Sequence, residues 1–240
     1  MAVDLVTAAV TKILDGIVEG QFVEERPLPP EAELARFLDV SRPTMREAVR
    51  TLSLGGVLNV VHGRGTFLLP RFRWHELRYL MYVASREGRA LEIEVEVLGV
   101  ESMLEIGSVR LAALKRTEAD VEALRQCLED VRVADRLGDV QAVVGSSNAF
   151  HDILLAATGN QFIASAVHPY RDALLSARFR TAESPQVRQR IMTSLEQILD
   201  AVDRRDPERA AEAMRTHMGR MREEIAAARP RRTDERVDIP

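Results

Sequence analysis

The sequence has few of the residues that build disulfide-rich, metal-clustered or membrane-spanning proteins. Its 240 residues contain one cysteine, Cys127, which excludes an internal disulfide framework and a zinc site made of several cysteines. The longest stretch without a formal charge, residues 153–170, contains glycine, proline and polar residues and is therefore no membrane span. Because Asp4 interrupts the N-terminal segment, we also expect no signal peptide, no membrane association and a cytoplasmic location.

Aromatic residues are also scarce, at 5% of the chain, whereas hydrophobic residues make up 46% and charged residues 29%. A chain that is instead rich in Ala, Leu, Val, Arg and Glu favours helices over sheets. Its net charge of −4 does not exclude a nucleic-acid partner, because binding depends on the local electrostatic field. Residues 41–73 contain six arginines against one acid, Glu47, so this segment has a local charge of +5.

The first 70 residues predict three helices. Apolar residues at spacings of three and four predict a helix over the first 20 residues, and Glu31–Leu38 follows a proline-rich bend as a short second helix. A tight turn at Asp39-Val40 then leads to Ser41, a favourable N-cap for a third helix. In that helix three arginines spaced four apart lie opposite the apolar face.

A β-hairpin is predicted after the third helix, which Gly55-Gly56 ends. Two β-prone runs, Val57–Val61 and Thr66–Leu69, flank a turn that contains two glycines. Three helices followed by a hairpin make a winged helix-turn-helix.

From residue 71 onward the strand signal disappears, and helical periodicity predicts an all-helical second half. The predicted helices are Trp74–Ser85, Ile93–Lys115, Glu118–Leu137, Val140–Thr158, Gln161–Phe179, Pro185–Arg204 and Pro207–Ala227. The predicted fold is therefore mainly α, with an N-terminal winged helix-turn-helix and a C-terminal bundle of about six to seven helices. We assign residues 1–70 to the first domain, 71–84 to a linker, 85–229 to the helical domain and 230–240 to a frayed tail.

Three segments of the first half, residues 28–35, 40–48 and 62–67, together resemble the GntR family of bacterial transcription factors in order and spacing. The second half resembles the FadR-type effector-binding domain of that family, with its best matches at Phe150-His151, at Gly159-Asn160 and along residues 198–217. The resemblance implies a transcriptional regulator, more often a repressor than an activator. It further implies a homodimer that binds a palindromic operator in double-stranded DNA and responds to a small metabolite in the helical domain.

The candidate DNA-contacting residues lie in the third helix and in the wing: Ser41, Arg42, Thr44, Arg46, Arg50, His62, Gly63 and Arg64. Either Arg42 or Arg46 could contact guanine O6 and N7 with two hydrogen bonds, and Ser41 or Thr44 could contact phosphate or base. Arg50 lies one turn further along the helix, and a contact with the DNA backbone is about as plausible for it as a contact with a base. The resemblance places the wing turn in the minor groove. Ala32 stands where relatives often have a basic residue, which removes one expected contact.

Many domains of the FadR type hold a divalent metal at four positions, which in this chain are Ser147, His151, Leu195 and His217. Leu195 supplies no ligand, so we expect no bound metal. If a metal were bound, His151 and His217 would be its candidate ligands, and His168 could replace a missing one. We take Ser147, His151 and His217 as candidate effector-binding residues. A metal-dependent carboxylate sensor remains an alternative.

The turn before Glu105 also lacks the arginine with which metal-type relatives grip a carboxylate. The effector is therefore expected to be larger or less acidic, such as an acyl or lipid-like molecule. A constitutive DNA-binding dimer that has lost its effector response is a second alternative. An enzyme is not expected, because Ser147 and His151 have no third orienting acid and no oxyanion loop.

Overall fold

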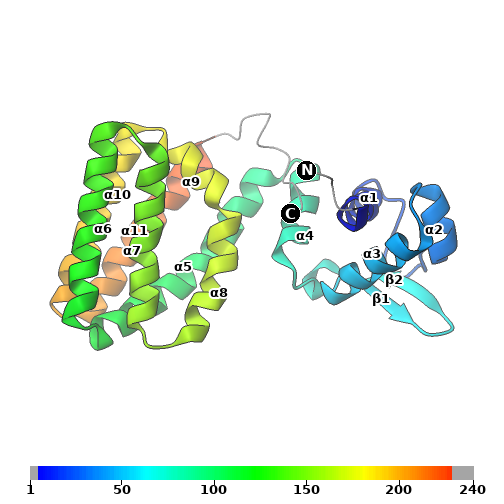
Figure 1. Ribbon diagram of the computed structural model, residues 1–240, viewed down its shortest axis with the longest axis horizontal. Helices are drawn as coiled ribbons and strands as arrows, with labels where there is room; N and C mark the ends of the chain where they lie inside the picture. The colour runs from blue at the N-terminus through cyan, green and yellow to red at the C-terminus, as the bar shows by residue number, and fades with distance from the viewer. Residues whose placement is uncertain (1–4, 229–240) are drawn as a thin grey trace. The chain divides into compact units, whose positions relative to one another are not determined.

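The structure is a computed structural model that describes residues 5–228, so the predicted tail at 230–240 lies outside the described residues. The described residues form two compact units, which meet in the sequence between Ala90 and Leu91. Each unit is described by itself below (Figure 1). None of the described helices is both long enough and apolar enough to cross a membrane.

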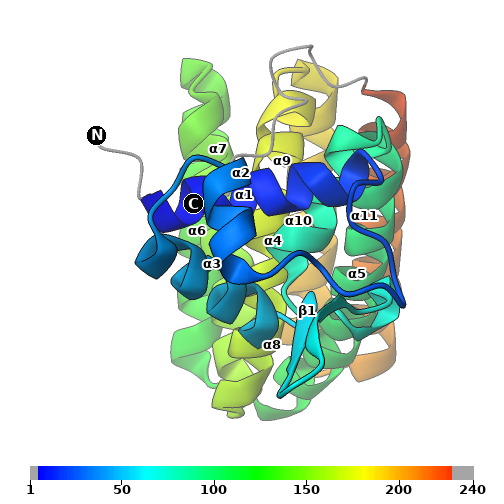
Figure 2. The ribbon, with the colours of Figure 1, turned by 90° about the vertical axis from the view of Figure 1, so that its right-hand side faces the viewer.

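The N-terminal unit confirms the predicted winged helix-turn-helix. Its elements are α1 (Leu5–Val18), α2 (Glu31–Phe37), α3 (Arg42–Leu54), β1 (Leu58–Val61), β2 (Gly65–Leu68), a single 3₁₀ turn η1 (Arg71–Arg73) and α4 (Leu77–Arg86). The strands are antiparallel, with Leu58 opposite Leu68 and Val61 opposite Gly65. Figures 1 and 2 both show this hairpin beside α3. Apolar side chains of α1, α3 and β1 share one core that includes Ile13, Leu52 and Leu58.

Helix α3 begins and ends at the residues that the sequence predicts. The Ser41 side chain accepts a hydrogen bond from the Thr44 amide at 3.2 Å, and proline follows in the first turn. Gly56 comes just after the helix with φ +75°, and a Cβ there would lie 2.6 Å from the carbonyl oxygen of Arg73. A glycine at this position therefore lets the chain turn from α3 into the wing beside another backbone segment.

The segment 71–84, which we expected to be a linker, packs on the N-terminal unit. Tyr79 of α4 lies in the core of this unit, and the Tyr82 hydroxyl donates to Asp15 of α1 at 2.7 Å. Arg86 also contacts Asp15, at 3.1 Å. These contacts explain why the first compact unit continues past the wing to Ala90.

The C-terminal unit is an all-helical bundle. Its helices are α5 (Ala90–Lys115), α6 (Glu118–Leu137), α7 (Val140–Ala157), α8 (Gln161–Ala173), α9 (Leu175–Ala182), α10 (Pro185–Asp203) and α11 (Pro207–Ala227). Helix α6 packs along α7, and α10 lies against both α6 and α11 (Figure 1). Local signals in the sequence fix several ends: Thr117 and Asp120 form a capping box, and Asp206 caps α11.

The prediction of one helix over Gln161–Phe179 is wrong, because the chain bends at Leu174 into α8 and α9. The Leu174 side chain is fully buried, so the bend lies inside the bundle. The arginines of the two helices, Arg171 and Arg178, reach two acids only four residues apart on α5. Positions seven apart on a straight helix are separated by about 10.5 Å along the axis, against about 6 Å for positions four apart. The bend thus matches the arginines to the closer spacing of the acids.

Candidate functional site

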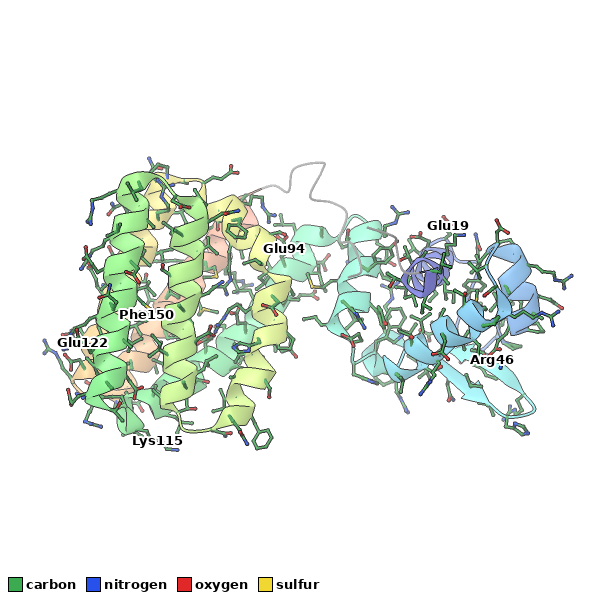
Figure 3. All side chains as sticks on the ribbon, in the orientation of Figure 1. Glu19, Arg46, Glu94, Lys115, Glu122 and Phe150 are labelled. Atoms are coloured by element: carbon green, nitrogen blue, oxygen red, sulfur yellow. The ribbon has the colours of Figure 1, made fainter. Side chains whose placement is uncertain are left out.

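The exposed face of α3 carries the arginines that the sequence singles out. The side chains of Arg46 and Arg50 are 74% and 71% exposed, and Arg42 is exposed as well. Arg46 is labelled on α3 in Figure 3. The opposite face of the same helix is buried, with Met45 and Leu52 fully covered. The helix is thus fixed by its apolar face and presents an arginine row outward.

Two of these arginines have acidic neighbours in the described structure. Arg46 lies 3.4 Å from Glu31 of α2, and Arg50 lies 3.7 Å from Glu47. Exposed pairs of this kind contribute about 0–1 kcal/mol, so DNA phosphates or base edges can displace the acids at little cost. The Ser41 hydroxyl lies 2.7 Å from that of Thr44 at the N-terminus of α3.

The wing turn projects three exposed residues between β1 and β2, namely His62, Gly63 and Arg64. The Arg64 amide donates to the Val61 carbonyl at 3.0 Å, which closes a tight turn. Gly63 has φ +73°, and a Cβ there would meet nothing within 4 Å. A glycine at this tip leaves the backbone accessible to a narrow groove.

A second site in the C-terminal unit begins with two carboxylates buried in the middle of α5. Glu101 and Glu105 are each 1% exposed. Arg178 of α9 donates to Glu101 at 2.6 Å, and Arg171 of α8 donates to Glu105 at 2.7 Å. Arg171 also reaches Asp152 of α7. The bundle therefore contains paired charges at its centre.

Two histidines lie next to these acids. His151 Nδ1 is 3.3 Å from Glu105 Oε2, and the rings of His151 and His217 lie 5.3 Å apart. Burial alone would raise the pKa of Glu105, but His151 and Arg171 outweigh it and lower the pKa to about 2. Burial, with the charges of His151 and Arg178, lowers the pKa of His217 to about 3, so His217 is neutral at pH 7.

A cavity lies between α7, α9, α10 and α11, next to His217. It is lined by Val144, Ser147, Asn148, Arg178, Thr181, Arg190, Ile191, Ser194, His217, Arg220, Met221 and Glu224. Its free volume is about 30 Å³, enough for about two water molecules. Three arginines against one glutamate give the lining a positive charge.

The cavity arginines are held by polar neighbours. Arg190 lies 2.7 Å from Glu224, and Arg220 donates to the Ser194 hydroxyl at 3.1 Å. The buried Nε2 of His217 has no hydrogen-bond partner among the described residues. A buried polar atom of this kind calls for a ligand or an ordered water molecule. The lining thus presents both positive charge and an open hydrogen-bonding site.

The structure brings together three of the four positions at which the resemblance places metal ligands. Ser147 and His217 line the cavity and the His151 ring packs against His217, whereas Leu195 is fully buried. Two imidazoles and a hydroxyl beside an apolar side chain do not fit a divalent metal, which needs about three or more protein ligands. Among the described residues, no group of three His, Cys, Asp or Glu side chains could hold a metal ion.

His168, the substitute ligand considered from the sequence, lies elsewhere. It is 48% exposed on α8, with its Nε2 3.1 Å from Asp152, and it does not line the cavity.

Sequence reasoning missed the arginines of this site. The turn before Glu105 lacks an arginine, but Arg178, Arg190 and Arg220 reach the cavity from three other helices. Arg171 and Arg178 lie seven residues apart, on the same apolar face as Leu174. Two arginines on an otherwise apolar face, together with the two acids Glu101 and Glu105 on α5, were the signal from which buried ion pairs could have been predicted.

The fold and the arginine face of α3 define a winged helix-turn-helix regulator with a separate helical domain. Residues 5–68 match the model of the gntR family of bacterial regulatory proteins, and residues 96–220 match the FCD domain. The chain therefore belongs to the GntR family, and it is a DNA-binding transcriptional regulator rather than an enzyme.

The relatives in this family include both activators and repressors. The Glc operon transcriptional activator of Escherichia coli K12 is 27% identical over 209 residues, which cover 84% of this chain and 81% of that protein. The repressor NanR of Edwardsiella tarda is 30% identical over 205 residues, covering 82% and 76%. Lar of Listeria monocytogenes has the same fold, with a TM-score of 0.60 and 18% identity over 94% of this chain and 98% of that one.

The neutral state of buried His217 predicts that stability falls as the pH drops below about 6.5. Its pKa is depressed in the folded protein, so the unfolded chain binds the extra proton, and stability is lost between pH 6.5 and 3 by up to about 1.4 kcal/mol per pH unit. Glu105 contributes only below about pH 4.5, because its pKa is lowered to about 2. Between pH 6.5 and 5 the contribution of His217 is therefore separate from that of Glu105.

The measurement is the free energy of unfolding in urea at several pH values. His217→Gln should flatten the slope between pH 6.5 and 5, whereas the exposed His168→Gln should leave it as in the wild type. An unchanged slope in His217→Gln would show that other groups take up the proton.

Proposed function

We propose that the protein is a homodimeric repressor that binds a palindromic operator through α3 and the wing, and releases it when a small anion binds in the α7–α11 cavity. The observation that carries the DNA-binding part is the row of exposed arginines on a helix whose other face is buried. A recognition helix must present such side chains to the major groove. This role also implies a cytoplasmic location.

In this proposal each exposed group has a distinct task. Arg42 and Arg46, near the N-terminus of α3, contact guanine edges, and Arg50 contacts the phosphate backbone. The hydroxyls of Ser41 and Thr44 contact phosphate or base at the N-terminus of α3.

The wing has a separate task, with His62 and Gly63 in the minor groove. Arg64, exposed beside them, contacts a phosphate. Gly63 allows the close approach of the wing backbone because its Cα carries no side chain.

The lining of the cavity favours a small anion over the acyl or lipid-like effector expected from the sequence. Arg190 and Arg220 can both turn toward a bound carboxylate or phosphate, and Ser147 and His217 offer further hydrogen bonds. The NanR relatives that match this chain are named repressors, which supports the proposed sign of regulation.

Arg42→Ala and Arg46→Ala should each weaken binding to an operator selected from random DNA by about 1–3 kcal/mol and relax the sequence preference at one position. Fluorescence anisotropy at fixed salt measures both effects. Arg215→Ala, an exposed arginine on α11, is the matched control and should bind as the wild type does. Wild-type affinity in either α3 variant would refute the role assigned to that arginine.

Arg64→Ala should weaken binding by a similar factor on every DNA sequence. If the side chain neutralises a phosphate, the slope of log affinity against log salt becomes shallower by about 1. A salt titration on the operator and on an unrelated duplex gives both slopes. A loss of affinity confined to the operator would instead assign Arg64 to base recognition.

Short dicarboxylates, sugar acids and sugar phosphates should raise the melting temperature and release the operator, whereas long-chain fatty acids should do neither. A ligand at 100 times its Kd stabilises the folded state by about 2.7 kcal/mol. Arg190→Ala and Arg220→Ala should lose this response. Arg222→Ala, which changes an exposed arginine on α11, should keep it. Stabilisation by fatty acids alone would overturn the anion proposal. No response to any ligand would favour the constitutive DNA-binding dimer.

A further inference from the structure

One face of α5 is exposed, with a methionine and two glycines at its centre and charged residues toward its ends. Seven exposed positions from Glu92 to Leu114 recur at spacings of three and four within a sector of about 80° around the helix, and exposed Leu111 borders this sector. These positions are Glu92, Glu96, Gly99, Met103, Gly107, Arg110 and Leu114. Met103 is 69% exposed and Leu114 is 57% exposed, and half-buried Val100 and Ile106 flank the row. We call this row the α5 face.

The two glycines of the α5 face are not required by the packing of the described chain. A Cβ at Gly99 or at Gly107 would meet nothing within 4 Å. A glycine inside a helix costs about 1 kcal/mol relative to alanine. Small residues on either side of an exposed methionine leave a shallow groove that another helix can approach closely. The α5 face therefore has the shape of a helix-packing surface without its partner.

The charges along α5 indicate what this partner is. On the α5 face the N-terminal half carries Glu92 and Glu96, and the C-terminal end carries Arg110. Glu94 and Lys115 mark the two ends in Figure 3. An antiparallel second copy of α5 would bring the acidic end of each helix to the basic end of the other, whereas a parallel copy would bring like charges together.

We propose that the α5 face is the dimer interface of this protein, with α5 of a second copy packed antiparallel across a two-fold axis at Met103. With the axis at residue 103, a residue of one copy lies opposite the residue of the other copy for which the two numbers add up to 206. Met103 meets its own equivalent, Gly99 lies opposite Gly107, and Glu96 lies opposite Arg110, each twice by symmetry. The inference rests on the homodimer of the proposed function and assigns its surface.

Arg110 already contacts Glu208 of α11 in the described chain. Both side chains are largely exposed, so this contact is weak and can be exchanged or shared with Glu96 of a second copy. The interior of the interface would be the methionine and the flanking aliphatic residues, with the charged residues at its rim.

The test is cross-linking of the full chain in a Cys127→Ser background, with Met103→Cys as the probe. Oxidation should join two copies through the symmetric cysteine pair, and Glu223→Cys, exposed on α11, should remain uncross-linked. Charge reversal gives an independent measurement by sedimentation equilibrium. Glu96→Arg and Arg110→Glu should each weaken dimerisation by about tenfold, because each turns two attractive pairs into repulsive ones.

The Glu96→Arg/Arg110→Glu double variant should restore the dimer to within about threefold of the wild type, and Glu223→Arg should have no effect. A wild-type dimer with no cross-link at Met103 and no response to charge reversal would overturn the α5 interface while leaving the proposed homodimer intact. A wild-type monomer that also binds the operator as a monomer would overturn both.

Discussion

The C-terminal bundle depends on the pairing of two carboxylates on α5 with two arginines from α8 and α9. An ionised carboxylate in an apolar interior costs several kcal/mol unless an opposite charge and hydrogen bonds compensate it. Glu101 and Glu105 have that compensation from Arg178 and Arg171, at 2.6 and 2.7 Å. Removing either arginine would leave a buried carboxylate without its partner. With both arginines present, the two ion pairs hold α8 and α9 against α5.

One of these arginines, Arg178, also lines the cavity. Ser147 and Leu195 stand at two of the four positions where the resemblance places metal ligands, and the positive charge at this cavity comes from arginines. Arg178, Arg190 and Arg220 supply it from the protein itself. A guanidinium binds carboxylate or phosphate through two parallel hydrogen bonds, so these arginines can hold an anion without a metal.

Most of the fold could be predicted from local signals, because caps, glycines and helical periodicity act over a few residues. Ser41, Gly55 and the capping box at Thr117 and Asp120 lie where the sequence indicates. The bend at Leu174 could not, since no glycine marks it and its cause lies on α5, about 70 residues earlier. For the same reason the proposed DNA-contacting face could be predicted from one helix, whereas the cavity is formed by side chains from four helices.

Helix α5 connects the two parts of this unit that the proposals concern. Its inner face holds Glu101, whose partner Arg178 also lines the cavity. An anion bound at Arg178 would share this guanidinium with Glu101 and would therefore act on the ion pair that holds α5. Met103 lies two residues further on, on the opposite side of the helix. A shift of α5 that relieves Glu101 would move the exposed face by the same rigid-body displacement, so ligand binding and dimer geometry would be coupled through a single helix.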